Sequence, residues 1–332
     1  MYEQTNQPRR DMPEEVNLQE IISKAMAMDD NTILELKITD QLADQVLLLV
    51  ALRLKPELDT EGTAQEILAW LVTHHPEAAL FSSTVIYMDP TFLDDQEAYQ
   101  TIRNLWQEHL QQPTLKAIEN AACFFSLLEY ELADELYQKG FELDPKNPLW
   151  LIKLAQACKH GGLNQLERTN LKDAKKALSY YEKAYALQSE EEQFYLLSDL
   201  CRTAYYAQEL EKAQKYANAA LTLAEKFRDN WNYGNALHHA HCILGRMALK
   251  EGRVEDASEH LLDSARSDGS PQLNSFGPDL SLAQELLAKG ATEEVIDFFD
   301  FCFTFWVSGR EDLTRWKILI EEGDTPNLRE LR

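Results

Sequence analysis

The chain has little glycine and proline, the residues that form most turns. Among 332 residues there are 12 glycines and 11 prolines, against averages of about 7% and 5%. The sequence contains no glycine-rich phosphate-binding motif and no GxSxG nucleophile motif. This scarcity argues against a β-sandwich and against an α/β enzyme that cradles phosphate groups. Because apolar residues still make up 45% of the chain, we expect helices joined by short turns around a substantial core.

Basic residues are also scarce. The chain has 32 Lys and Arg against 56 Asp and Glu, which gives a formal net charge of −24. Such a charge argues against binding to nucleic acids or to anionic membranes, which attract basic proteins. The acidic excess is uneven, because residues 151–260 contain 15 acidic and 15 basic residues. We therefore expect an acidic protein with an electrically balanced central segment.

Cysteine pairs and long hydrophobic runs are missing as well. The five cysteines are widely spread and form no CxxC pair, which argues against a disulfide framework. The longest aliphatic run, Val46–Leu52, is far shorter than the about 20 residues of a membrane-spanning helix. The polar N-terminus, Met1–Asn17, has no apolar signal region. We expect a cytoplasmic protein with no membrane partner.

The clearest repeat unit spans Thr114–Asn147. It is expected to form two helices with small and large residues where a tightly packed pair needs them: Ala121, Phe124, Ala133, Tyr137 and Pro145. This pattern resembles the 34-residue tetratricopeptide repeat (TPR). The resemblance implies an antiparallel helix pair that packs against the pairs before and after it.

Four weaker copies follow, with small or branched residues at the position of Ala133: Ala177, Ala213, Ala257 and Val295. The third copy opens with a capping box, Ser189-x-x-Glu192. We therefore predict an all-α protein, a right-handed α-solenoid of TPR-like helix-turn-helix repeats. The run from Gly234 to Gly290, with the loop Gly269–Pro278 as its distinctive part, resembles the C-terminal part of bacterial TPR-containing proteins. That resemblance implies a bacterial origin and no particular activity.

The expected domain organisation has four parts. Residues 1–15 are predicted to be a disordered tail, and 16–113 an N-terminal helical region, either degenerate repeats or a small helical domain. The TPR-like array covers 114–309, and residues 310–332 form a C-terminal capping helix and tail. The N-terminal region has five expected helices: Gln19–Met28, Asp40–Leu54, Ala64–His74, Glu77–Met88 and Asp94–Gln111. The breaks lie at Lys55-Pro56, His75-Pro76, Asp89-Pro90 and Gln112-Pro113.

Six aromatic residues lie within nine positions near the end of the array, at residues 298–306. On a helix, Phe298, Cys302 and Phe305 form one apolar stripe, and an adjacent stripe contains Phe299, Phe303 and Trp306. We expect this helix to be covered on both sides, by the fourth repeat and by a final helix at Asp312–Glu322. A homo-oligomer formed through the 298–306 helix is possible but not favoured.

One histidine cluster has spacing compatible with metal binding. His238 and Cys242 are an i, i+4 pair, with His241 beside them and His260 on the next expected helix. Helical residues at these spacings more often pack in a core or face a groove, so we predict no metal site and no cofactor. Paired acids occur at helix starts, where the helix dipole favours them. With no recognisable acid–base pair in a cleft, we predict that the protein is not an enzyme.

The better site prediction follows from the TPR resemblance. In that family the first helix of each repeat lines a concave groove, which implies a set of groove residues here: Lys153, Gln156, Lys159, Arg202, Tyr205, Tyr206, His239, Arg246 and Lys250. A basic, aromatic groove in an acidic protein suits an acidic peptide or protein segment. The predicted function is a non-catalytic scaffold or adaptor that binds such a segment. The alternative is a peptide- or metal-responsive regulatory sensor. Reversing Arg202 and Arg246 to Glu is expected to abolish partner binding and leave thermal stability nearly unchanged.

Overall fold

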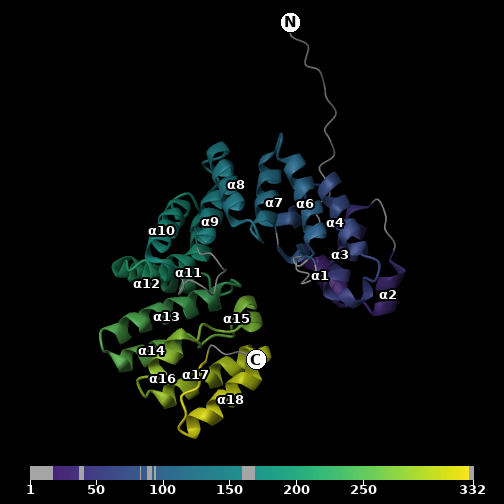
Figure 1. The fold of residues 1–332 in the computed structure, drawn as a ribbon. Coiled ribbons are helices and arrows are strands. Elements are labelled where there is room, and N and C mark those ends of the chain that lie inside the picture. Colours follow the sequence, from purple (N-terminus) through teal and green to yellow (C-terminus); the bar gives the residue numbers. More distant parts are fainter. Residues whose placement is uncertain are drawn as a thin grey trace. The chain divides into compact units, whose positions relative to one another are not determined.

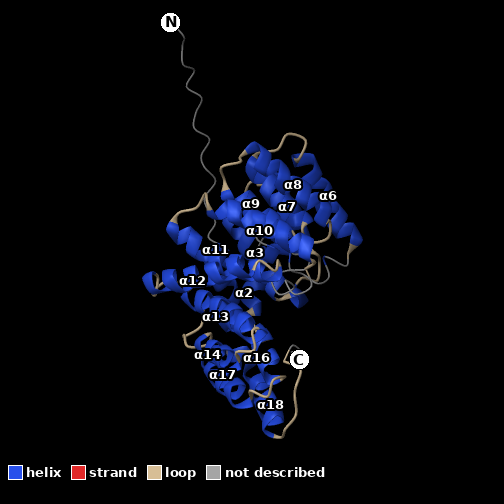
Figure 2. Cartoon of the chain, turned by 90° about the vertical axis from the view of Figure 1, so that its left-hand side faces the viewer, coloured by secondary structure: helices blue, strands red, loops and turns tan. Residues whose placement is uncertain are grey.

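The computed structural model describes residues 18–36, 41–82, 84–87, 92, 95–158 and 169–328. All regular secondary structure in these residues is helical (Figure 2). The chain divides into two compact units, residues 1–145 and 146–332. The helix pair of the clearest repeat therefore belongs to the first unit, and the weaker copies belong to the second. The predicted tail at 1–15 and the groove residue Lys159 lie outside the described residues.

The first unit consists of α-helices joined by short 3₁₀ turns. Its elements are α1 (Leu18–Met26), α2 (Asp30–Glu35), α3 (Leu42–Leu54), η1 (Pro56–Leu58), α4 (Thr63–His74), η2 (Ala79–Ser82), η3 (Thr84–Tyr87), α6 (Gln96–His109), α7 (Leu115–Phe125) and α8 (Tyr130–Leu143). Helix α3 packs against α1 and α4, α4 packs against α6, and α7 pairs with α8 (Figure 1).

The prediction of one helix at Glu77–Met88 is wrong, because the described residues of this segment form only the 3₁₀ turns η2 and η3. Ser and Thr compete for backbone hydrogen bonds and β-branched residues lose side-chain freedom in helices, so the segment around Thr84 is a poor helix former. A tertiary contact from α7 holds the start of this segment instead. The buried side chain of Asn120 in α7 donates hydrogen bonds to the carbonyl oxygens of Pro76, at 2.8 Å, and Ala78, at 3.0 Å.

The second unit contains two short helices, Pro271–Phe276 and Ser281–Leu287, among longer ones. Its elements are α9 (Pro148–Ala157), α10 (Leu171–Tyr185), α11 (Glu190–Tyr206), α12 (Leu210–Lys226), α13 (Tyr233–Lys250), α14 (Val254–Asp263), α15 (Pro271–Phe276), α16 (Ser281–Leu287), α17 (Thr292–Phe305), the 3₁₀ turn η5 (Val307–Gly309) and α18 (Arg310–Glu321). Consecutive helices pack as pairs, α9 with α10, α11 with α12 and α13 with α14 (Figure 1). Helix α11 also packs directly on α13, so the first helices of two neighbouring pairs share an interface.

Local sequence signals explain why these pairs form. The predicted capping box is confirmed, because the Ser189 side chain accepts from the Glu192 amide and the Glu192 carboxylate accepts from the Ser189 amide. The predicted small residues at the helix crossings, Ala177, Ala213 and Ala257, are fully buried. Small side chains there let the helix axes approach closely. The pairing of helices in this unit was therefore readable from the sequence.

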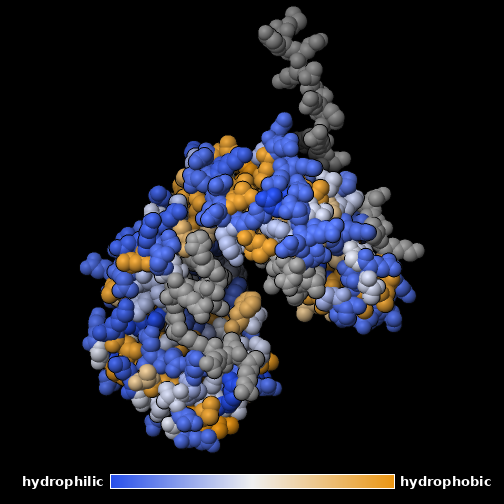
Figure 3. Space-filling view, viewed as in Figure 1, coloured by the Kyte–Doolittle hydropathy of each residue, from blue (hydrophilic) through white to orange (hydrophobic). Residues whose placement is uncertain are grey.

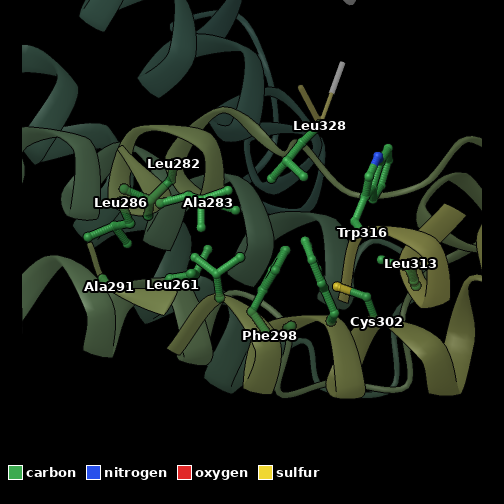
Figure 4. Close-up of a cluster of buried hydrophobic side chains, with 14 of the residues drawn as sticks. Leu261, Leu282, Ala283, Leu286, Ala291, Phe298, Cys302, Leu313, Trp316 and Leu328 are labelled. Atoms are coloured by element: carbon green, nitrogen blue, oxygen red, sulfur yellow. The ribbon is translucent and has the colours of Figure 1, made fainter. Parts of the chain in front are cut away.

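The C-terminal core surrounds α17, which packs against α14, α16 and α18 (Figure 4). The predicted coverage on both sides is confirmed, with the stripe of Phe298, Cys302 and Phe305 fully buried. The second stripe needs a correction: Phe299 and Trp306 are buried, but Phe303 is 42% exposed. The Arg310 guanidinium, at the start of α18, lies 4.8 Å from the centroid of this ring and covers part of it.

Candidate functional site

A cluster of aromatic and basic side chains lies where the end of α11 meets α13. The Lys250 ammonium lies 4.3 Å from the centroid of the Tyr205 ring, and the Arg246 guanidinium lies 4.8 Å from the same centroid. Arg246 also lies 5.5 Å from the Tyr206 ring, which packs edge-on against Tyr205. The negative face of an aromatic ring attracts cations, so the two tyrosines allow two like charges to sit one helical turn apart. We call Tyr205, Tyr206, Arg246 and Lys250 the α11–α13 cluster.

Arg246 makes several hydrogen bonds within the α11–α13 cluster and around it. It is only 9% exposed, and its Nε and Nη2 donate to Glu285 Oε1 of α16 at 2.9 and 2.6 Å. Its Nη1 donates to the Tyr206 hydroxyl at 2.8 Å. Burial by itself lowers the pKa of Arg246, but Tyr206 and the Glu285 carboxylate outweigh burial and raise it. Arg246 is therefore permanently charged, and its charge is balanced inside the chain.

Arg202, the other arginine expected in the groove, also has a carboxylate nearby. Burial would raise the pKa of Asp279, in the loop before α16, but the positive charge of Arg202 and the hydrogen bond from the Ser281 amide hold it below its usual value. Asp279 is thus ionised at neutral pH and offsets the positive charge of Arg202. The local field is consequently less positive than a count of basic residues in α11 and α13 suggests.

The buried side of α13 is held by His238. Its Nε2 accepts a hydrogen bond from the Asp279 amide at 2.7 Å, so its Nδ1 carries the proton and donates to the Ser264 carbonyl oxygen at 3.1 Å. Burial lowers the pKa of His238 and keeps the ring neutral. Both ring nitrogens are therefore engaged by backbone groups. Cys242 lies 3.7 Å from Nε2, and burial raises the pKa of its thiol, so this pair is a packing contact rather than a metal site.

The remaining predicted groove residues that the structure describes are less closely associated with the α11–α13 cluster. His239 is half-buried and packs edge-on against His238. Lys153 is half-buried and Gln156 exposed on α9, and the contacts described for residues 146–158 and 169–328 do not join either to the α11–α13 cluster. The structure therefore brings together four of the nine predicted residues. Five of the nine residues at 298–306, expected as a possible dimer face, are buried within the unit, whereas Phe301 and Phe303 are exposed.

Sequence reasoning missed three residues that shape this region: Glu285, Asp279 and Asp263. Glu285 and Asp279 reach Arg246 and His238 across 39 and 41 positions, and no local spacing signals such pairings. Asp263 lies three positions after His260 on α14, a spacing that could have been read as one helix face. It belongs to a second cluster, with His241 of α13 and His260, whose possible ligand atoms lie within 4.8 Å of one another.

Comparison of the chain with protein-family models gives no match, and neither does comparison with curated proteins. None of the helices in the described residues is both long and apolar enough to cross a bilayer. The face of the second unit seen in Figure 3 is largely hydrophilic, with hydrophobic side chains in separated patches.

Proposed function

We propose that the protein is a non-catalytic interaction scaffold that binds an acidic peptide or protein segment at the α11–α13 cluster. The observation that carries the proposal is the convergence of two bases and two tyrosines from neighbouring helices. Tyr205 and Arg246 are buried and hold the cluster together, whereas the half-buried Tyr206 offers a partner part of its ring and its hydroxyl at little cost in side-chain entropy. The exposed Lys250 is the group that meets the partner first.

The fold is proposed to be a right-handed solenoid of TPR-like repeats. Two observations support it. Successive helices pack as pairs with alanines at the crossings, and α11 packs directly on α13, although α12 lies between them in the sequence. In such an array the first helices of neighbouring pairs form one continuous surface. This is the surface on which Tyr205, Tyr206, Arg246 and Lys250 meet.

Glu285 suggests how an acidic partner is recognised. Its carboxylate already accepts two hydrogen bonds from Arg246 and is one-third exposed at the edge of the cluster. Because Glu285 already neutralises the buried Arg246, a carboxylate on the partner contacts Lys250 and the Tyr206 hydroxyl instead. The acidic remainder of the chain repels the same partner, which restricts binding to this surface.

The proposal of a non-catalytic role is supported by the state of the cysteines. All five are buried, and burial raises the pKa of Cys201 to about 12. A thiol must ionise to act as a nucleophile. Burial also raises the pKa of Cys242 and Cys302, so these three thiols remain protonated at neutral pH.

Binding can be tested with a fluorescein-labelled peptide of ten glutamates, using fluorescence anisotropy at low and high salt. An exposed charged contact contributes up to about 1 kcal/mol, so reversal in Lys250→Glu is expected to weaken binding about 5- to 20-fold. Tyr206→Phe separates the hydroxyl contact from the ring contact. The matched control is Lys172→Glu, the same charge change at an exposed position of α10.

Two outcomes would refute the proposed site. One is an equal loss of affinity in Lys172→Glu, which would mean that only net charge matters. The other is equal binding of a ten-glutamine peptide, which would show that acidic groups are not recognised. Circular dichroism of each variant checks that the helices are intact.

A further inference from the structure

Three potential metal ligands converge between α13 and α14. His241 projects from α13, and His260 and Asp263 project from α14, three positions apart. The Nδ1 atoms of His241 and His260 are 3.0 Å apart. One ring nitrogen of each histidine and one carboxylate oxygen of Asp263 lie within 4.8 Å of one another. All three side chains are half-buried, so an ion can reach them from solvent.

The spacing of the two imidazoles fits a tetrahedral metal ion. Two nitrogens bound to one zinc ion at about 2.0–2.1 Å lie about 3.3 Å apart, close to the 3.0 Å between the two Nδ1 atoms. Only a small movement of each ring is needed to admit the ion. Imidazole nitrogen and carboxylate oxygen are both zinc ligands. A set of two imidazoles and one carboxylate does not suit calcium or magnesium, which prefer oxygen ligands.

The backbone around the cluster is fixed before any ion binds. Gly245 lies one helical turn after His241, and a Cβ built at this glycine would lie 3.0 Å from the Cβ of His260 and 2.5 Å from a methyl group of Leu282. The absence of a side chain at position 245 thus brings α13 and α14 close together beside the two histidines. Ligands held on packed helices lose little entropy when they bind a metal.

The protonation states also suit a metal. Burial lowers the pKa of His241 to about 4, and burial also lowers the pKa of His260. Both rings are therefore neutral at pH 7, as metal ligands must be. The 3.0 Å contact requires a proton on one Nδ1, which moves to Nε2 of the same ring when the ion binds.

We infer that His241, His260 and Asp263 bind a zinc ion that bridges α13 and α14. The three protein ligands leave a fourth position for water, as in zinc sites that are not closed. Asp263 Oδ1 accepts a hydrogen bond from Arg266 at 2.6 Å, which orients the carboxylate and leaves its other oxygen for the ion. The inference is independent of the proposed peptide-binding function, because no residue is shared with the α11–α13 cluster.

The test is calorimetric titration of the full-length protein, first freed of metal by a chelator, with zinc chloride. We expect one zinc ion per chain, and a loss of affinity of at least about 100-fold in His260→Ala, since removing even an outer-shell partner of a ligand typically costs 10- to 100-fold. Asp263→Asn keeps the shape of the side chain and removes its charge, and is expected to weaken binding by about 10-fold or more. Cobalt substitution provides a second readout, because tetrahedral cobalt has strong visible absorption.

The matched control removes another pair of adjacent histidines, His74 and His75, whose ring centroids lie 4.9 and 5.1 Å from that of Trp70 in the first unit. The double variant His74→Ala, His75→Ala is expected to bind zinc as the wild type does. Loss of binding in this control with retention in His260→Ala would overturn the inference, as would a wild-type chain that takes up no zinc. If His260→Ala alters the circular dichroism spectrum, the shape-conserving Asp263→Asn decides the outcome.

Discussion

The ion pair between Arg246 and Glu285 can be tested by removing the charge of its acidic partner. In Glu285→Gln the side chain keeps its size but no longer balances the buried guanidinium. At an effective dielectric constant of about 20, two unit charges about 4 Å apart attract by about 4 kcal/mol. Solvent screens part of this, because the Glu285 side chain is 33% exposed whereas that of Arg246 is 11% exposed. The Tyr205 and Tyr206 rings and the Tyr206 hydroxyl still stabilise the cation.

We therefore expect Glu285→Gln to lower the free energy of unfolding by about 2 kcal/mol, below the 3–5 kcal/mol typical of a fully buried pair. For a unit of this size, about 2 kcal/mol corresponds to a fall in Tm of about 4–8 °C. Urea and thermal unfolding followed by circular dichroism measure both quantities. The same reasoning means that Arg246→Glu destabilises the fold, so the expectation of nearly unchanged stability on reversing Arg246 does not suit its buried position.

A double-mutant cycle isolates the pair. Arg246→Met fills the same space without charge, and combining it with Glu285→Gln is expected to cost less than the sum of the two single changes. Asp300→Asn, which removes the acidic partner of the more exposed pair Lys317–Asp300, serves as the control and is expected to have no measurable effect. If Glu285→Gln is as harmless as this control, the guanidinium is not held by Glu285, and the reasoning fails.

Two further predictions concern the packing and the pH dependence of α13. A Cβ at Gly234 would lie 2.0 Å from the Gly269 carbonyl oxygen, so Gly234→Ala is expected to cost about 1–3 kcal/mol by overpacking; an unchanged urea midpoint would mean that the loop moves freely. In the folded chain, burial lowers the pKa of His238 below its usual value of 6.5. The unfolded chain therefore binds more protons below about pH 6.5, and the free energy of unfolding falls as the pH decreases from there. His238→Gln can still accept from the Asp279 amide and donate to the Ser264 carbonyl, and its stability is expected to vary less with pH over this range; equal slopes for both proteins would contradict the assignment.

The elements of the fold were largely readable from the sequence because their causes are local. Capping at Ser189 and alternation of small and large side chains around Ala177 and Ala213 act within a few residues of each other. The same holds for the buried stripe of α17. The expected helix Glu77–Met88 is the exception, because the start of this segment is held by Asn120, more than 40 residues away, which donates to the carbonyl oxygens of Pro76 and Ala78.

The environment of the site residues was decided by the tertiary structure alone. The sequence placed Tyr205, Tyr206, Arg246 and Lys250 on the first helices of two repeats, and α11 does pack on α13. It did not indicate that the chain after α14 returns to α13, bringing Asp279 and Glu285 against it. Helix periodicity determines which face a side chain lies on, whereas its charge partners depend on the path of distant loops. For that reason the sequence indicated a basic surface, and only the packed structure showed that much of its charge is balanced within the chain.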